Sequence, residues 1–232
     1  MLSIPVMAQS PVAIETVAPL TEIELLIERH IQSLEKGLAD ESKFEEAKNK
    51  TIRTDFGMLS LLGQSLAEHK DKSARKINGP ALRDAALTYN RKGTYVEARA
   101  AFTQIQSVLN GTVSGEHALL HPWNKLINMH PMMEEMNAAS GALPRILRKP
   151  RGKPEEALPA VSWALLAIAM KADTHEVKDP NDLPQWNTWS DDFLVSSLKL
   201  AEAVRAKDGA TGRKWFDQAN ETCDACHARF RD

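Results

Sequence analysis

Two cysteines near the end of the chain stand three positions apart, and a histidine follows the second one directly. They are Cys223, Cys226 and His227 in the segment ETCDACHARFR, and the chain has no other cysteine. On a helix these are positions i, i+3 and i+4, so the three side chains project from one face. The pattern C-x-x-C-H is typical of covalent haem attachment, in which two thiols bond to vinyl groups along one porphyrin edge and the imidazole binds the iron. The sequence therefore predicts one covalent haem c.

Three other sites can be built from a pair of thiols, and each needs a structure for which the sequence gives no sign. A tetrahedral zinc site needs a fourth ligand at a familiar spacing. A redox dithiol of the thioredoxin type needs a βαβ context. A disulfide between Cys223 and Cys226 would close a very short ring within a helix, which strains its geometry. These alternatives stay open behind the haem interpretation.

Apolar residues recur at helical spacing along the chain, and alternating strand patterns are absent. Helices are expected over residues 20–38, 43–69, 81–89, 96–109, 130–147, 155–175, 190–206 and 211–231. The small, polar segment NGTVSG at 110–115 is the best candidate for a domain boundary. The sequence predicts an all-α protein of two tandem four-helix up-down bundles. We assign residues 1–19 to a tail, 20–113 to a haem-free domain and 114–232 to a haem-binding domain.

A loose internal repeat supports the two domains. The segments KGTYVEARAAFTQIQSVLNG and KDGATGRKWFDQANETCDACH each follow the third helix of their half. Placing Phe102 over Phe216 puts Leu109, Thr112 and Val113 where the second copy has its two cysteines and histidine. The first copy, aligned in this way, has no haem site.

The face of the last helix that carries the haem is also expected to be its buried face. Large rings that could exclude water from the cofactor stand upstream, just ahead of and within the predicted helix at 190–206. For Trp186 and Trp189, together with Phe193, a wall against the macrocycle and ordinary core packing are equally good interpretations. The predicted buried stripe consists of Trp215, Ala219, Cys223, Cys226 and Phe230.

These motifs resemble the class II cytochromes c, the cytochrome c′ group, over residues 125–232. The resemblance is strongest in CDACHARFR, and WSDDF at 189–193 is similar to the start of that family's third helix. MEEMNAASGAL at 133–143 is similar to the first helix of low-spin members, which carries a methionine ligand. The resemblance therefore implies that Met133 is the distal haem ligand. It also implies dimers packed through the first two helices, or an intramolecular pseudo-dimer in which the haem-free domain takes the partner's place.

The distal side of the iron decides the function. His/Met ligation would give six-coordinate iron with a raised potential, suited to passing single electrons. Pro131 lies within the proposed ligand helix and would start or kink it. An empty distal side would instead bind nitric oxide or carbon monoxide, and His130 or a methionine next to Met133 is a further candidate ligand. Four methionines cluster here, at Met129, Met132, Met133 and Met136.

We expect a c-type cytochrome that is not an enzyme and that exchanges electrons with redox proteins by brief docking. A gas-binding haem protein is the second hypothesis. The third is an interaction subunit in which the first domain is a docking module and the haem is structural. The pair His117 and His121 has the i, i+4 spacing of metal ligands but no third ligand nearby, so we expect surface or hinge residues.

Composition narrows the remaining classes of function. The chain has 29 basic and 31 acidic residues among 232, and neither half has a basic surplus, which removes the usual electrostatic reason to expect nucleic-acid binding. No apolar run approaches the roughly 20 residues of a membrane span. The start MLSIPVMAQS is similar to the end of a secretory signal, which favours an exported, periplasmic protein.

Overall fold

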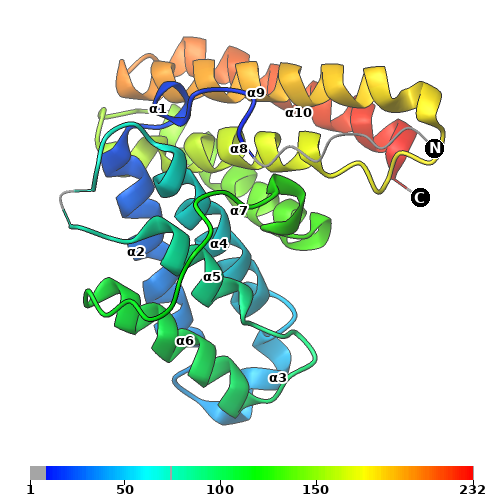
Figure 1. Cartoon of the computed structure of the whole chain (residues 1–232). Coiled ribbons are helices and arrows are strands. Elements are labelled where there is room, and N and C mark those ends of the chain that lie inside the picture. The colour runs from blue at the N-terminus through cyan, green and yellow to red at the C-terminus, as the bar shows by residue number, and fades with distance from the viewer. Residues whose placement is uncertain (1–8, 74, 232) are drawn as a thin grey trace. The chain divides into compact units, whose positions relative to one another are not determined.

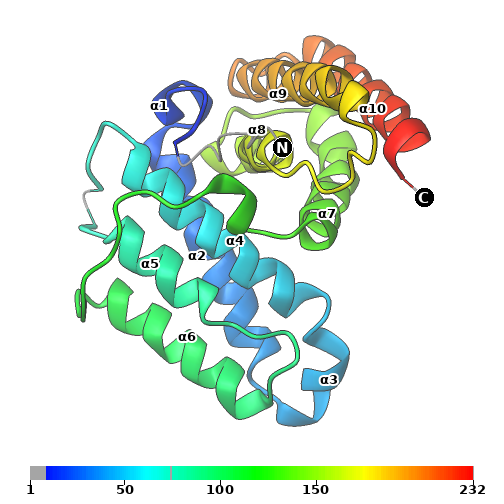
Figure 2. The same cartoon turned by 45° about the vertical axis from the view of Figure 1, so that its right-hand side comes forward.

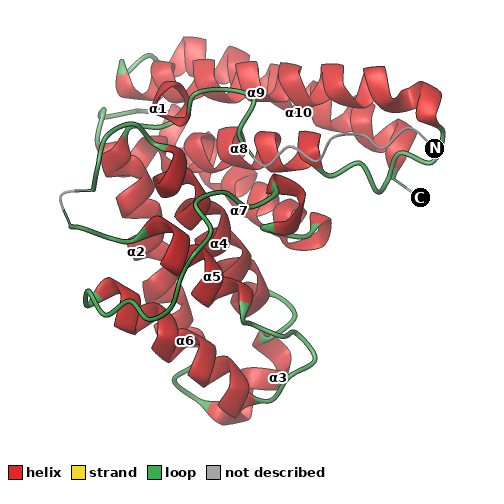
Figure 3. Cartoon of the chain, in the orientation of Figure 1, coloured by secondary structure: helices red, strands yellow, loops and turns green. Residues whose placement is uncertain are grey.

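The computed structural model describes residues 9–73 and 75–231, and Figure 1 shows the course of the chain. Every regular element in these residues is helical, and they contain no strand (Figure 3). This confirms the all-α prediction. The proposed signal remnant falls largely on residues 1–8, outside the described residues. The first element beyond them is α1 (Ile14–Val17), in which Ile14 and Val17 are buried.

Two compact units make up the chain, and they meet between Glu134 and Glu135. This point lies inside α7 (Met129–Leu147), so residues 129–134 of α7 belong to the first unit and the rest to the second. The loop that precedes α7 is anchored in the first unit. There the indole Nε1 of Trp123 donates a 2.8 Å hydrogen bond to Glu68.

The first unit is built around α4 (Thr51–Glu68), in which 13 of 18 residues are buried. Helices α2 (Leu20–Gly37) and α5 (Gly79–Leu87) pack against α4, and α6 (Tyr95–Leu109) packs against α5 (Figure 2). Helix α4 is buried on nearly all sides because it lies at the centre of the unit. The shorter elements of the unit are η1 (Glu41–Lys43), α3 (Phe44–Ala47) and η2 (Trp123–Lys125).

The predicted continuous helix at 43–69 is wrong, because the chain forms two helices there. Helix α3 ends at Ala47 and α4 begins at Thr51. Between them Lys50 has φ −118° and ψ −109°, outside the helical region. A change of direction at this point lets Phe44 of α3 meet Tyr95 of α6, with 5.6 Å between ring centroids.

Helices α4 and α5 approach closely because glycines stand at their contact. A Cβ atom on Gly63 would lie 2.5 Å from the backbone nitrogen of Arg83. A Cβ atom on Gly79 would lie 2.6 Å from the carbonyl oxygen of Gly63. Any larger residue at either position would push the two backbones apart.

The second unit contains the rest of α7 together with α8 (Pro154–Ala172), α9 (Leu183–Arg205) and α10 (Gly209–Phe230). Helix α9 packs against both α8 and α10. The indole Nε1 of Trp163 in α8 donates a 2.9 Å hydrogen bond to the carbonyl of Met136, which joins α8 to α7. Leu147 at the end of α7 lies against Gly209 and Gly212, the first turn of α10.

Helix α9 begins at Leu183 and not at residue 190, so the predicted start is wrong. The short helix η3 (Pro180–Asp182) leads directly into it, and Pro184 occupies the first turn, where proline is tolerated. Trp186 and Trp189 therefore lie on α9 and not in a loop ahead of it. Their positions along the helix are fixed by its regular geometry.

Candidate functional site

The cysteine and histidine motif lies in the last two turns of α10. The helix starts at an N-cap, Asp208, whose carboxylate accepts a 2.9 Å hydrogen bond from the backbone nitrogen of Thr211. It runs without interruption to Phe230. The helical spacing places the side chains of Cys223, Cys226 and His227 on one face.

The three motif side chains are partly exposed and lie beside a buried stripe. Neither cysteine forms a disulfide, and both are half-buried, as is His227. The buried side chains of α10 are Phe216, Ala219, Thr222 and Phe230, together with Gly212. Trp215, which the sequence placed in this stripe, is half-buried, and Phe216 takes the core position instead. Phe216 is adjacent in sequence, and only packing distinguishes the two.

Burial keeps both thiols in their neutral form. It raises the pKa of the Cys223 thiol to about 12, with smaller contributions from Cys226 and Asp224, and it raises the pKa of the Cys226 thiol to about 11. Burial and the nearby Arg231 lower the pKa of His227, which Asp224 only partly offsets. The imidazole is therefore neutral at pH 7, the form that has a lone pair available for a metal.

Aromatic rings pack together at the end of α10, where Phe230 follows the motif. The Phe230 ring meets Trp186 edge-on, with 5.0 Å between centroids and an interplanar angle of 86°. It meets Trp189 in the same way, at 5.8 Å and 82°. The indole Nε1 of Trp186 donates to the carbonyl of Met170 at 3.1 Å, which fixes the ring in the core. Two of the predicted pocket residues, Trp189 and Phe230, are thus in contact at the motif.

The third predicted pocket residue, Phe193, lies in a second ring cluster. It is 2% exposed and packs on Trp163, with 5.2 Å between ring centroids. Trp163 also stacks on Phe216 of α10, at 5.8 Å and 10°. This cluster supports α10 from the core side, near the middle of the helix. Neither Trp163 nor Phe216 was predicted to have a role at the site.

An ion pair holds the end of α10 to the start of α9. Arg229 donates to both carboxylate oxygens of Asp182, at 2.9 and 2.8 Å. Asp182 raises the pKa of Arg229, chiefly through this hydrogen bond. The two residues are 47 positions apart, so no local pattern in the sequence could reveal the pair.

The proposed distal ligand, Met133, is half-buried on α7, within the part of that helix that belongs to the first unit. Of the other candidates, His130 is exposed and Met129 is half-buried, whereas Met132 and Met136 are buried. A pairing of Met133 with His227 stays a prediction. Pro131 lies in the first turn of α7, where a proline does not break the helix.

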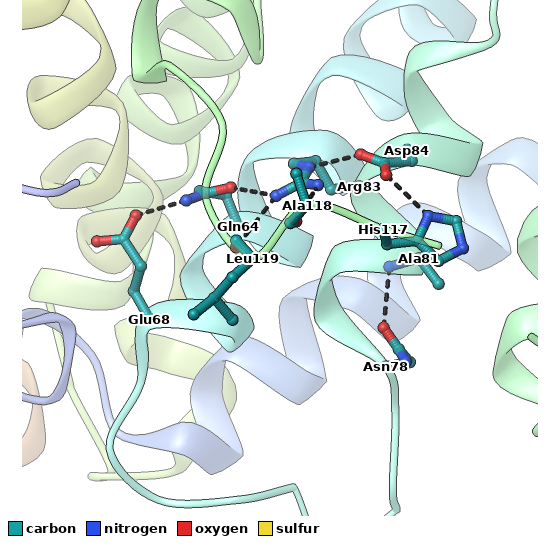
Figure 4. Close-up of polar contacts among 9 residues, drawn as sticks. All are labelled: Gln64, Glu68, Asn78, Ala81, Arg83, Asp84, His117, Ala118 and Leu119. Carbon is teal, nitrogen blue, oxygen red and sulfur yellow. Dashed lines mark hydrogen bonds and ion pairs between the residues drawn. The ribbon is translucent and has the colours of Figure 1, made fainter. Parts of the chain in front are cut away.

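A second polar cluster lies in the first unit, and Figure 4 shows it. Arg83 is completely buried and donates to Asp84, Gln64 and the carbonyl of Ala118, each at 2.7 Å. His117 completes the cluster with a 2.8 Å contact between its Nδ1 and the Asp84 carboxylate. The sequence predicts a surface or hinge position for His117. Its side chain instead ties the loop before α7 to α5 through Asp84.

The same cluster extends along α4. Gln64 donates from Nε2 to Glu68 at 2.6 Å, and Glu68 also accepts the indole hydrogen bond of Trp123. Beside Asp84 a hollow of about 350 Å³ opens, which His121 lines. Among the described residues, no three His, Cys, Asp or Glu side chains are grouped so that they could hold a metal ion.

No family model, curated protein or solved structure matches this chain. No helix within the described part of the chain has both the length and the apolar character needed to cross a membrane. The similarity to class II cytochromes c therefore rests on the motif residues alone.

Proposed function

We propose that the protein is an exported c-type cytochrome that passes single electrons between redox proteins. Its second unit would be a four-helix bundle carrying one haem, with thioether bonds to Cys223 and Cys226 and with His227 as the proximal ligand. The observation that carries this proposal is the continuous helix α10, which sets two free thiols and a neutral imidazole on one partly exposed face.

The chemistry of the donor set suits this cofactor. A bound haem would supply a one-electron iron couple at the surface of the protein. Net addition of each thiol across a vinyl group would form a carbon–sulfur bond at one vinyl carbon and place the thiol hydrogen on the other. The neutral imidazole can bind iron, and its half-buried position limits its exchange with water.

The aromatic residues next to the motif would provide an apolar wall. Phe230, at the end of α10, lies against both Trp186 and Trp189 of α9. Rings of this size exclude water from a cofactor, and the apolar surroundings of a haem tune its reduction potential. Their position supports a role for Trp189 and Phe230 beside the haem. Phe193 packs on Trp163, so in this proposal it supports the haem-bearing helix from the core.

Met133 is our proposed distal ligand, and it would make the iron six-coordinate and suited to electron transfer. The first unit would be a haem-free four-helix bundle that serves in docking or as an internal partner in a pseudo-dimer. In this proposal the protein is not an enzyme, and its partners are redox proteins that bind briefly.

The decisive experiment is expression of the full chain with export and haem attachment in a bacterial host. We expect a red protein whose haem stays on the polypeptide in denaturing electrophoresis. Replacing both cysteines by serine should abolish the covalent haem, whereas Asp224→Asn, a change at the exposed residue between them, should retain it. A colourless wild-type protein with two reactive thiols would contradict the proposal.

The distal ligand is tested on the red protein by absorption spectroscopy. Ferric wild type should be low-spin with a charge-transfer band from thioether to iron, and Met133→Ala should remove that band. Met129→Ala, a change at another half-buried methionine of the same helix, should keep it. Rapid formation of a carbon monoxide adduct by the reduced wild-type protein would instead favour the gas-binding function.

A further inference from the structure

The contact between Arg229 and Asp182 joins the end of α10 to the start of α9. These two helix ends carry the rings that lie next to the motif. Asp182 is the residue directly before α9, at the N-cap position, yet its side chain makes no capping hydrogen bond to α9. Both of its carboxylate oxygens accept from Arg229 instead. Asp182 is 22% exposed and Arg229 is 57% exposed, so the ion pair lies at the surface of the second unit.

The last turn of a helix is the part that frays most readily, because its carbonyl groups have no partners within the helix. In α10 this turn contains His227 and Phe230. Phe230 keeps its edge-on contacts with Trp186 and Trp189 only while the turn is formed. An external contact at residue 229 therefore acts where the helix most needs support.

We propose that Arg229 is a positioning residue: its two-fold ion pair with Asp182 holds the last turn of α10 on the start of α9 and keeps Phe230 closed against Trp186 and Trp189 beside the motif. This inference rests on the proposed haem function. The pair would thereby limit the access of water to the proximal side of the haem, which raises the reduction potential relative to a more hydrated site.

A single guanidinium nitrogen, Nη2 of Arg229, donates to both carboxylate oxygens of Asp182. A lysine can make a contact of the same kind, as Nζ of Lys171 does with both carboxylate oxygens of Asp191. Arg229→Lys should therefore restore part of the function that Arg229→Ala loses. Arg213→Ala removes the same charge from the same helix, so it separates the effect of the ion pair from a general effect of net charge.

The test uses the full-length haem protein and four variants: Arg229→Ala, Arg229→Lys, Asp182→Asn and Arg213→Ala. Arg213 is a matched control, because it forms an exposed ion pair with Asp217 near the other end of the same helix. Two quantities are measured on this protein, the midpoint potential and the hydrogen–deuterium exchange rate of the backbone amides in the last turn of α10.

We expect Arg229→Ala and Asp182→Asn to raise this exchange rate about two- to fivefold, because losing one solvent-exposed ion pair increases the population of the frayed turn by about that factor. Arg229→Ala should also lower the midpoint potential, Arg229→Lys should lie between it and wild type, and Arg213→Ala should match wild type. An unchanged exchange rate and an unchanged potential in Arg229→Ala would overturn the inference while leaving the haem function intact. A wild-type protein without haem would overturn both.

Discussion

The two units of the chain fill their interiors in different ways. In the first unit the central helix α4 buries polar side chains beside its apolar ones, among them Asp55 and Gln64, and the guanidinium of Arg83 from α5 is completely buried. In the second unit every residue of α8 from 157 to 170 is buried, and only Ser162 among them is hydrophilic. Aromatic rings from α8, α9 and α10 complete that interior.

The contrast shows what each interior can do. A buried polar network must satisfy every hydrogen bond, so it fixes the register of its helices and leaves little freedom to accept a foreign group. An interior of rings and small apolar residues makes few such demands and offers a surface on which another flat, apolar group can pack. This difference supports our proposal that the second unit, and not the first, carries the haem.

The largest expected effect comes from removing the centre of the polar network. Arg83→Ala leaves the side chains of Asp84 and Gln64 without their buried donor, and should lower the free energy of unfolding by about 3–5 kcal/mol. Arg213→Ala, at a half-exposed arginine of the second unit, should stay within about 0.5 kcal/mol of wild type. Urea unfolding followed by circular dichroism measures both. Equal effects of the two changes would mean that burial of the polar network is not what distinguishes the first unit.

A smaller effect is expected from adding a methyl group to a helical glycine in each unit. Gly63→Ala should destabilise by about 1–3 kcal/mol, because the added Cβ would meet the backbone of Arg83 at 2.5 Å. Gly141→Ala, in the part of α7 that belongs to the second unit, has open space around it and should stabilise by about 0.5–1 kcal/mol through helix propensity. Thermal unfolding of the two variants should therefore shift in opposite directions. A stabilised Gly63→Ala protein would show that the α4–α5 contact is looser than described.

The smallest expected effect is a pH dependence of stability that comes from Asp84 in the first unit. Burial opposes the ionisation of Asp84, but hydrogen bonds from Arg83 and His117 outweigh it, so the pKa of Asp84 is below its usual value of 3.8. The Asp84 carboxylate therefore binds a proton more readily in the unfolded chain than in the folded one. The stability that Asp84 contributes is therefore complete above that usual value and is lost as the pH falls through the lower pKa of the folded state.

Urea unfolding at pH 7 and at pH 3 measures this contribution. Asp84→Asn should reduce the difference between the two pH values, and the part that remains comes from other carboxylates whose pKa is lowered, such as Glu97. Asp217→Asn, a change at an exposed carboxylate of the second unit, should leave the difference as it is in wild type. A difference of the same size in Asp84→Asn and wild type would remove Asp84 from the explanation.

The sequence alone determined the helical class and the approximate place of most helices. Helix α6 (Tyr95–Leu109), for example, directly follows its N-cap Thr94, whose side chain forms a capping box with Glu97, and both signals lie within four residues. The motif at Cys223, Cys226 and His227 is equally local, and α10 carries all three. Periodicity and capping act over one or two turns, so a linear sequence displays them directly.

Tertiary structure alone decided which of these residues meet. The split between α3 and α4, the early start of α9 and the choice of Phe216 over Trp215 depend on packing against distant helices. The contact of Arg229 with Asp182 joins residues 47 apart, and that of Trp123 with Glu68 joins residues 55 apart. Such pairs form because the folded chain brings charges and rings together in space, and no spacing along the chain encodes that proximity.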